Sequence, residues 1–292
     1  MENGQAPFCK RGVGKDESIT MKSFLKALTL GTAAVLMAGS LAACGGDAGT
    51  SSKDGGASDA SEAEVSLNLV EDGKLIMGTN AQFPPFEFLE GTEVSGIDAE
   101  IMAAVAEKLG LTLEIKDMEF DSLPESISSK QIDIIAAGFT ARPDREEKMD
   151  FSDSYYTAQQ TIIVPADSEI ASKEDLEGKK IGGQVGTTGI AEAENLTDTA
   201  NITSYSNGAL AVEALLTGNL DAVIIDNNPA IEFRDNNSDK LKLIEGQFED
   251  ENYVFGIQKG NKALLDAVNN AIKELKDDGT MQEILDKYIS KF

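Results

Sequence analysis

The sequence predicts an α/β protein of two lobes, each a mixed, mostly parallel sheet flanked by helices. Short apolar runs alternate with segments whose apolar residues recur every three or four positions, which is the order of strands and helices in an α/β fold. The length of 292 residues exceeds one average domain. The pattern Ile132-Asp133-Ile134 returns in the second half as Leu220-Asp221-Ala222. These features together indicate two lobes related by a structural repeat.

The first half supplies strands and helices in alternation. Residues 74–79 are apolar and end at a turn, so they are expected to form a buried strand. An apolar residue recurs at every fourth position over residues 97–109, which predicts an amphipathic helix. Asp98 is expected to cap the start of that helix and Gly110 its end. A strand over residues 111–116, a helix over residues 122–129 and a strand over residues 132–137 are expected to follow.

The second half repeats this order and ends in two helices. Residues 180–183 are expected to form a strand that leads through the turn Gly186–Gly189 into a helix. A helix over residues 209–216, a two-residue turn and a buried strand within residues 218–226, and a strand over residues 254–257 come next. The apolar face of the following helix consists of Leu264, Leu265, Val268, Ile272 and Leu275. Gly279 is expected to end this helix, and Thr280 and Glu283 have capping-box spacing for a last one.

The composition argues against several classes of function. Acidic residues number 51 and basic residues 25, which gives a formal net charge of −26 at pH 7. No nucleic-acid partner is expected, because contact with a phosphate backbone needs a basic face. The absence of His removes His-based metal sites and Ser-His or Cys-His catalysis. Both cysteines, Cys9 and Cys44, lie in the N-terminal segment, so neither metal nor cofactor is expected in the folded part.

The N-terminal residues are expected to direct and anchor the chain. Residues 21–43 have the charged start, apolar middle and small-residue end of a secretory signal peptide, with a buried helix as the alternative. Because Met21 is the better start, residues 1–20 are expected to be an extension from a misassigned start codon. The run Leu41-Ala42-Ala43-Cys44 resembles the cleavage box of bacterial lipoproteins, which implies acylation of Cys44. Residues 44–71 would then be a lipidated cysteine and a flexible tether.

The residues that could carry chemistry come directly after predicted strands. Four segments do so: Asn80–Phe86, Gly138–Arg145, Gly186–Gly189 and Asp226. The carboxyl ends of parallel strands and the clefts between lobes are favoured ligand sites in α/β proteins. The four segments offer aromatic rings, a guanidinium, hydroxyl groups on glycine-flanked turns and a carboxylate. Such a set suits the binding of a zwitterion better than it suits catalysis.

Arg145 and Asp226 are the candidate partners for the two charges of a zwitterion. A guanidinium holds a carboxylate through two parallel hydrogen bonds, although Arg145 has surface pairing with Glu146 or Glu147 as an alternative. Asp226 ends an apolar strand, where an ionised carboxylate needs a cationic partner such as an α-ammonium group. The alternative role for Asp226 is to cap a helix that begins near Pro229.

Two threonines and two phenylalanines complete this part of the candidate site. Thr187 and Thr188 open a helix whose free N–H groups and dipole favour an anion, and an ordinary capped helix start is the alternative. Phe83 and Phe120 could flank an aliphatic side chain, whereas burial in the core is the usual fate of Phe.

Several linked motifs are similar to those of bacterial extracellular solute-binding proteins of the polar amino-acid ABC importers, the glutamine-, lysine/arginine/ornithine- and histidine-binding type. The motifs are Gly78–Phe88, Gly96–Ile101, Ala137–Thr140 with Pro143–Arg145, and Phe151–Tyr156. The resemblance extends over residues 72–292. It implies a type II periplasmic-binding-protein-like fold, in which two crossing strands near residues 157–162 and 249–254 act as a hinge. Lobe 1 would comprise residues 72–158 and 254–292, and lobe 2 residues 159–253.

The resemblance also implies a role for each candidate residue. The ligand α-carboxylate would be held by Arg145 and by three threonines: Thr140, Thr187 and Thr188. Asp226 would hold the α-ammonium, with the carbonyl group of Gly138 as a further acceptor. Phe83 and Phe120 would flank the ligand side chain.

The residues around the ligand side chain favour a neutral ligand. Asn80 stands where binders of basic amino acids often carry Asp, and Ala137-Gly138 stands where they often carry two serines. The expected ligand is therefore a neutral polar L-amino acid such as glutamine. A basic amino acid and cystine are the alternatives.

The resemblance implies further partners and a location. The free amino acid would pass to a membrane ABC permease driven by a cytoplasmic ATPase. The protein is expected to be a monomer, lipid-anchored on the extracytoplasmic face of the cell membrane, at the cell surface or in the periplasm. It is expected not to be an enzyme. The alternatives of another class are a ligand-sensing domain and a cyclohexadienyl-dehydratase-like enzyme, for which Glu87 or Glu119 offers a general acid.

Overall fold

Two β-sheets, each with one reversed strand, form the framework of the chain. The computed structural model describes residues 66–289. The first sheet has the strand order β5-β1-β6-β14-β7. Its strands are β1 (Lys74–Thr79), β5 (Thr112–Asp117), β6 (Ile134–Ile135), β7 (Met149–Phe151) and β14 (Gly256–Gln258). β1 is parallel to β5 and β6, whereas β14 is antiparallel to β6 and β7.

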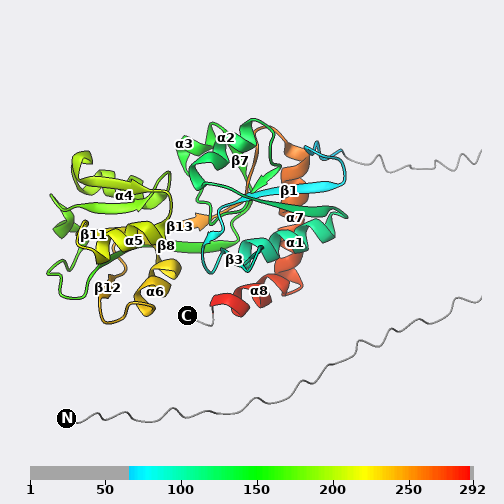
Figure 1. Cartoon of the computed structure of the whole chain (residues 1–292). Helices are drawn as coiled ribbons and strands as arrows, with labels where there is room; N and C mark the ends of the chain where they lie inside the picture. The colour runs from blue at the N-terminus through cyan, green and yellow to red at the C-terminus, as the bar shows by residue number, and fades with distance from the viewer. Residues whose placement is uncertain (1–65, 290–292) are drawn as a thin grey trace, which may run out of the picture. The chain divides into compact units, whose positions relative to one another are not determined.

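Helices cover both faces of the first sheet (Figure 1), because β1, an interior strand, is apolar on both sides. The helices are α1 (Ile97–Lys108), α2 (Leu123–Ser128), α7 (Lys262–Asp277) and α8 (Thr280–Ile289). Leu75 and Met77 of β1 share a core cluster with residues of α1 and α7. Ile76, which points to the opposite face, packs in a second cluster with residues of α2. The predicted α/β layering of this lobe is confirmed.

The second sheet has the strand order β10-β9-β11-β8-β12. Its strands are β8 (Tyr156–Pro165), β9 (Ile181–Gln184), β10 (Ile202–Tyr205), β11 (Ala222–Asp226) and β12 (Leu241–Ile244). β9 is parallel to β10 and β11, and β8 is antiparallel to β11 and β12. The helices are α4 (Thr188–Leu196), α5 (Gly208–Leu216) and α6 (Asn227–Asp235). α4 and α5 cover opposite faces, since residues of β11 alternate between their two core clusters.

The two sheets share one strand order, which agrees with the predicted repeat. In the first sheet β1 lies between its parallel neighbours β5 and β6, and in the second β9 lies between β10 and β11. The strand that follows in each order, β14 or β8, is reversed. The carboxylate of Asp133 accepts the N–H of Ile76 in β1 at 2.8 Å. The carboxylate of Asp221 accepts the N–H of Lys180, next to β9, at 2.8 Å. An equivalent Asp therefore ties the third strand to the first in both lobes.

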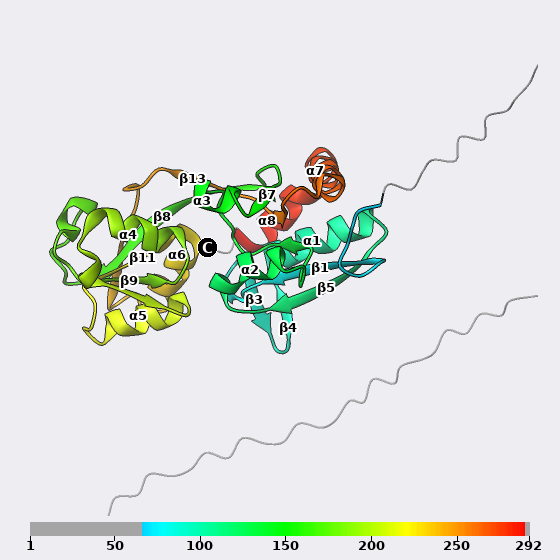
Figure 2. The same cartoon turned by 90° about the horizontal axis from the view of Figure 1, so that it is seen from above.

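Two strands connect the sheets. β13 (Asp250–Tyr253) pairs antiparallel with the first half of β8, and the second half of β8 pairs within the second sheet. β13 leads into β14 of the first sheet, so both crossings lie side by side (Figures 1 and 2). The remaining elements are β2 (Gln82–Phe83), β3 (Glu87–Glu90), β4 (Glu93–Ser95), α3 (Pro143–Glu146) and three short 3₁₀ turns. β2, β3 and β4 form a small antiparallel sheet.

The start of α1 differs from the prediction. The cap position is Gly96, and the N–H groups of Ile97 and Asp98 donate to the backbone carbonyls of Pro85 and Phe86 at 3.1 and 2.9 Å. Asp98 lies inside the helix, so the prediction that it caps α1 was wrong. Because backbone carbonyls already satisfy these donors, the Asp98 side chain is free for other contacts.

The start of α8 also differs from the prediction. Thr280 is the first residue of the helix and not its cap, so the predicted capping box with Glu283 was wrong. The carboxylate of Asp278 accepts the backbone N–H of Thr280 at 3.0 Å. This hydrogen bond supplies the cap that the sequence pattern assigned to a hydroxyl group.

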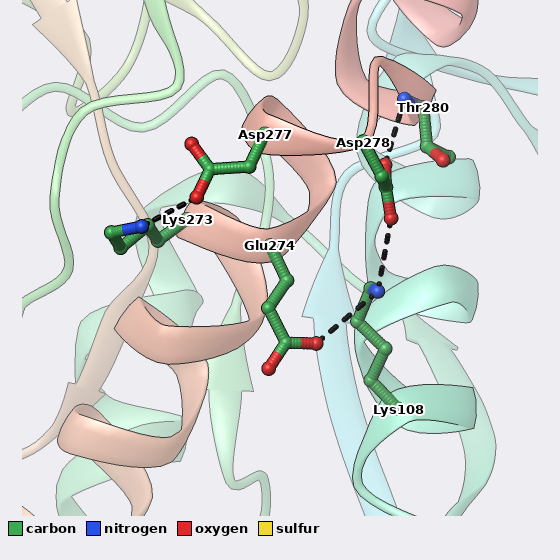
Figure 3. Close-up of polar contacts among 6 residues, drawn as sticks. All are labelled: Lys108, Lys273, Glu274, Asp277, Asp278 and Thr280. Carbon is green, nitrogen blue, oxygen red and sulfur yellow. Dashed lines mark hydrogen bonds and ion pairs between the residues drawn. The ribbon is translucent and has the colours of Figure 1, made fainter.

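A polar cluster joins the C-terminal ends of α1 and α7 (Figure 3). Lys108 donates to Asp278 at 3.2 Å and to Glu274 at 3.3 Å. Hydrogen bonds from Thr280, with the charge of Lys108, lower the pKa of Asp278 to about 2. Lys273 and Asp277 pair separately on α7. The acidic side chains are 46–65% exposed and that of Lys108 is 26% exposed, so the ion pairs stabilise the helix ends only modestly.

The predicted signal peptide, Cys44 and most of the predicted tether lie outside the described residues. Within residues 66–289, no helix combines the length and the apolar character needed to cross a bilayer.

Candidate functional site

One cavity lies at the carboxyl ends of strands from both sheets. It encloses about 340 Å³, counting space open to solvent. Nine of its lining residues are the ones predicted from the sequence: Asn80, Phe83, Phe120, Gly138, Thr140, Arg145, Thr187, Thr188 and Asp226. The others are Glu87, Ala137 and Gln184. Both sheets therefore supply the strand ends at which α/β proteins bind ligands.

Arg145 is a buried cation at the cavity wall. It belongs to the short helix α3 and is 5% exposed. Its Nη1 donates to the carbonyl of Thr140 at 2.7 Å, and its Nη2 donates to the carbonyl of Gly186 at 2.8 Å. The guanidinium carbon lies 4.0 Å from the centre of the Phe139 ring. Burial, and then the charge of Arg142, lower the pKa of Arg145 to about 10, so the group stays protonated at neutral pH.

Arg145 retains donors for a ligand. A guanidinium has five N–H groups, and the two hydrogen bonds to backbone carbonyls leave others available. Among the described residues, the predicted alternative, an ion pair with Glu146 or Glu147, does not form. A buried guanidinium without a carboxylate partner favours the binding of an anionic group.

Asp226 is a buried carboxyl group on the same cavity. It ends β11 and is 7% exposed. Although it occupies the cap position of α6, its side chain makes no capping hydrogen bond, so the capping alternative is contradicted. Its Oδ1 instead accepts the hydroxyl of Tyr253 at 2.5 Å. Burial, and then the charge of Glu251, raise the pKa of Asp226 to about 7, and a nearby cation would favour its ionised form.

The turn after β6 places Gly138 and Thr140. Gly138 has φ +51°, and a Cβ there would lie 2.9 Å from the ring of Phe83, so only glycine fits. The N–H of Gly138 donates to Asp98 at 2.9 Å. Thr140 accepts from Arg145 with its carbonyl and donates from its hydroxyl to Glu251 at 2.7 Å. Thr140 thereby orients Arg145 at the cavity.

The start of α4 borders the cavity through Thr187 and Thr188. Thr187 is the cap residue, but its hydroxyl donates to the carbonyl of Gln184 at 2.7 Å and makes no capping hydrogen bond. The first-turn N–H groups of α4 are therefore not capped by this side chain. They and the helix dipole favour an anion at this wall of the cavity.

Asn80 joins the two sheets at the base of the cavity. Its Nδ2 donates to the carbonyl of Met118 at 2.9 Å, and its Oδ1 accepts Nε2 of Gln184 at 2.8 Å. Gln184 also donates to the carbonyl of Ser206 at 3.0 Å. Both amide side chains are thus held in place by other groups of the protein.

Phe83 and Phe120 have both of the roles considered for them. Each is mostly buried, with a ring neighbour in the core: Phe86 at 6.0 Å and Phe139 at 5.7 Å between ring centres. Each also lines the cavity, where its ring offers an apolar surface to a ligand side chain.

Sequence reasoning missed Glu87 and Gln184 as cavity residues. Gln184 ends β9 as Asp226 ends β11, so the strand-end rule applied to β9 would have found it. Glu87 was considered only as a general acid for the enzyme alternative, yet it is 1% exposed, it lines the cavity, and no described N–H or O–H group donates to its oxygens. Burial, followed by the charges of Asp98 and Asp226, raises the pKa of Glu87 well above its ordinary value.

The arrangement offers a site for an anion and a site for a cation in one cavity. Arg145 and the start of α4 favour the anion, whereas Asp226 favours the cation. Apolar rings cover the space beside them. This combination matches the groups of an α-amino acid.

Comparison with known proteins places the chain among binding proteins. Residues 75–291 match the family model described as bacterial extracellular solute-binding proteins, family 3. The arginine-binding extracellular protein ArtP of Bacillus subtilis (strain 168) is 33% identical over 221 residues, which cover 74% of this chain and 86% of ArtP.

Solved structures share the fold. An ancestral arginine-binding protein bound to arginine has a TM-score of 0.70 and 36% identity, covering 74% of this chain and 98% of that one. An ancestral arginine-binding protein bound to glutamine has a TM-score of 0.71 and 36% identity, covering 75% and 98%. The predicted type II periplasmic-binding-protein-like fold is therefore confirmed.

Proposed function

Because the chain belongs to family 3 of the bacterial extracellular solute-binding proteins, we propose that it captures a free L-amino acid outside the cytoplasm for an ABC importer. One observation carries this proposal: Arg145 and Asp226 line the same cavity, both are buried, and neither has an ion-pair partner within residues 66–289. The ligand carboxylate and ammonium would each supply the missing partner. Closure of the lobes would exclude water and strengthen both contacts.

Closure links binding to delivery. The ligand must favour the closed arrangement by differential affinity, and the closed form then docks on a membrane permease driven by a cytoplasmic ATPase. β8 and β13 are the proposed hinge, because they are the strands that pass between the sheets. The protein is proposed to act as a monomer.

A neutral polar amino acid such as glutamine is the first candidate ligand. Asn80 and Gln184 give the base of the cavity neutral amide groups, without the carboxylate that basic ligands often meet there. The glutamine-bound ancestral structure shows that a related protein can hold this ligand.

A basic amino acid is the second candidate, and Glu87 favours it. Glu87 is a second carboxyl group on the cavity beside Asp226, and a cationic ligand would favour its ionised form. The name of ArtP supports the same class, and cystine remains a third candidate.

A thermal-shift screen of the twenty amino acids and cystine tests the proposal. A ligand that binds only the folded chain raises the melting temperature, by an amount that grows with its concentration over Kd. The expected result is a rise with a polar L-amino acid and none with its D-enantiomer. If no L-amino acid raises the melting temperature and calorimetry detects no binding, the proposed function is wrong. Turnover of prephenate or arogenate would favour the enzyme alternative, and ligand-dependent binding to a membrane kinase the sensor.

We also propose that Cys44 carries the lipid anchor, and Cys44→Ser tests this. The variant is expected to leave the membrane fraction, because the acyl chains that hold the protein are attached at this thiol. The measurement is membrane fractionation followed by immunoblotting. Ser51→Ala, in the proposed tether, is the matched control and should stay with the membrane. Retention of Cys44→Ser would contradict lipidation.

A further inference from the structure

Glu87 is a buried carboxyl group for which the described part of the chain supplies no cation and no hydrogen-bond donor. It begins β3 and is 1% exposed, no described N–H or O–H group donates to its oxygens, and its one hydrogen-bond neighbour is another carboxyl group, Asp98 of α1. A polar group buried in this way costs free energy unless something else satisfies it. Because Glu87 lines the same cavity as Arg145 and Asp226, a ligand in that cavity can satisfy it.

The groups that act most strongly on Glu87 are acidic and come from several elements. Asp98 approaches from α1, Asp226 from the end of β11 and Asp117 from the end of β5. Tyr155, which precedes β8, also faces this cluster and donates its hydroxyl to Asp98 at 2.6 Å. Burial and these neighbouring acids raise the pKa of Glu87 well above its ordinary value, which favours its protonated form in the unliganded chain.

An entering ammonium group changes this balance. A positive charge beside Asp226 and Glu87 favours the ionised form of both carboxyl groups. Asp226 already accepts one hydrogen bond, from Tyr253, whereas no described N–H or O–H group donates to Glu87. An ammonium group has three N–H donors, so after hydrogen bonding to one carboxylate it can still donate to a second carboxyl group.

We propose that Glu87 is a second carboxyl group for the ligand ammonium and that it gives its proton to solvent when the amino acid binds. The proposal rests on the proposed function, since it takes an amino acid as the occupant of the cavity. The step is balanced: the carboxylic acid becomes a carboxylate, the ammonium keeps its three protons, and one proton passes to the buffer. Binding is consequently weaker in acid.

Two other roles for Glu87 predict different behaviour. A purely structural acid would keep its proton whether or not the cavity is filled. A group that contacts the ligand side chain would release its proton only to a cationic side chain. A metal site is not supported, because no cluster of acidic residues within residues 66–289 has a metal-binding arrangement.

Calorimetry of the full chain with L-glutamine and, separately, L-arginine distinguishes these roles. Titrations at neutral pH in phosphate and in Tris, whose ionisation enthalpies differ, count the protons released per molecule bound. We expect release with either amino acid that binds, and an affinity that rises with pH by up to about tenfold per pH unit. Glu87→Gln is expected to release fewer protons and to show a flatter pH profile. Glu90→Gln, on the exposed end of the same strand, is the matched control and should behave as wild type.

A second measurement needs no variant. In the chain labelled with carbon-13 glutamate, the infrared band of a protonated glutamic acid should be present without ligand at neutral pH and should disappear when the amino acid is added. This result supports the proposal even if Glu87→Gln fails to fold.

The outcomes separate the two proposals. If the wild-type chain binds neither these amino acids nor any other in the screen, the proposed function fails and the role of Glu87 fails with it. If it binds without losing the infrared band, or if Glu87→Gln releases as many protons as wild type, the role of Glu87 alone is wrong. Release with L-arginine but not with bound L-glutamine would place Glu87 at the side chain and overturn the assignment to the ammonium.

Discussion

Replacing Arg145 with alanine is expected to weaken amino-acid binding by about 2–5 kcal/mol, or roughly 30-fold to several-thousand-fold in Kd. The variant removes a guanidinium that is 5% exposed and leaves the ligand carboxylate in the cavity without its cation. It also removes the hydrogen bonds that hold the carbonyls of Thr140 and Gly186. Calorimetry with the amino acid identified in the screen measures the loss.

Arg145→Lys and Arg234→Ala complete the Arg145 experiment. Lysine keeps the charge but lacks the paired donors of a guanidinium. The affinity of Arg145→Lys for the amino acid is therefore expected to lie between those of wild type and Arg145→Ala. Arg234 is a partly exposed arginine of α6 that pairs with its neighbour Asp235, and Arg234→Ala should bind as wild type. Wild-type affinity in a folded Arg145→Ala chain would remove Arg145 from the site.

Replacing Asp226 with asparagine is expected to cost a similar 2–5 kcal/mol of binding free energy, because the ligand ammonium loses a buried anionic partner. Asparagine has nearly the same shape and can still accept the hydroxyl of Tyr253. The loss therefore reports charge and not packing. Asp235→Asn, on the exposed end of α6, is the matched control. An Asp226→Asn chain with unchanged affinity would contradict the ammonium site.

The stability of the unliganded chain gives a second test of Asp226. Its pKa is about 7 in the folded chain against an ordinary 3.8, so the folded chain binds this proton more tightly than the unfolded chain. The contribution of Asp226 to stability therefore falls as pH rises from about 3.8 to about 7. Thermal unfolding of Asp226→Asn should show a flatter pH dependence than wild type over this range. The same steep dependence in both would show that Asp226 is not the buried acid described here.

Elements with a clear apolar period could be predicted from the sequence. The run of residues 74–79 is apolar on both faces of its strand, and α1 and α7 each carry one apolar stripe. The helix caps could not be predicted, because the acceptor for the first N–H groups of a helix can come from a segment that only the tertiary structure brings close. Asp98 has the residue type and the position of a cap, but the carbonyls of Pro85 and Phe86 accept the first N–H groups of α1 instead.

The site residues that could be predicted from the sequence are those with a charged side chain at or after the end of a predicted strand. Arg145 and Asp226 follow strands and carry charges that need partners, so the sequence alone marks them. Glu87 lacks this signal, because a glutamate in a short hairpin usually points to solvent. Only the packing of β3 against α1 shows that it is enclosed with Asp98.

Each connection between the lobes brings a tyrosine to a buried acid, which is Asp226 at the cavity in one case and Asp98, beside Glu87, in the other. Tyr155 donates to Asp98 where β8 begins, and Tyr253 of β13 donates to Asp226. Under the proposed function, an amino acid bound at Asp226 would share this carboxylate with Tyr253 of β13, one of the two strands proposed as the hinge. The affinity for the amino acid and the rate of its release would then both depend on the carboxylate of Asp226. Substitutions that raise the affinity for use at low ligand concentration would therefore slow release to the importer. Affinity and release rate could not both be improved independently at this position.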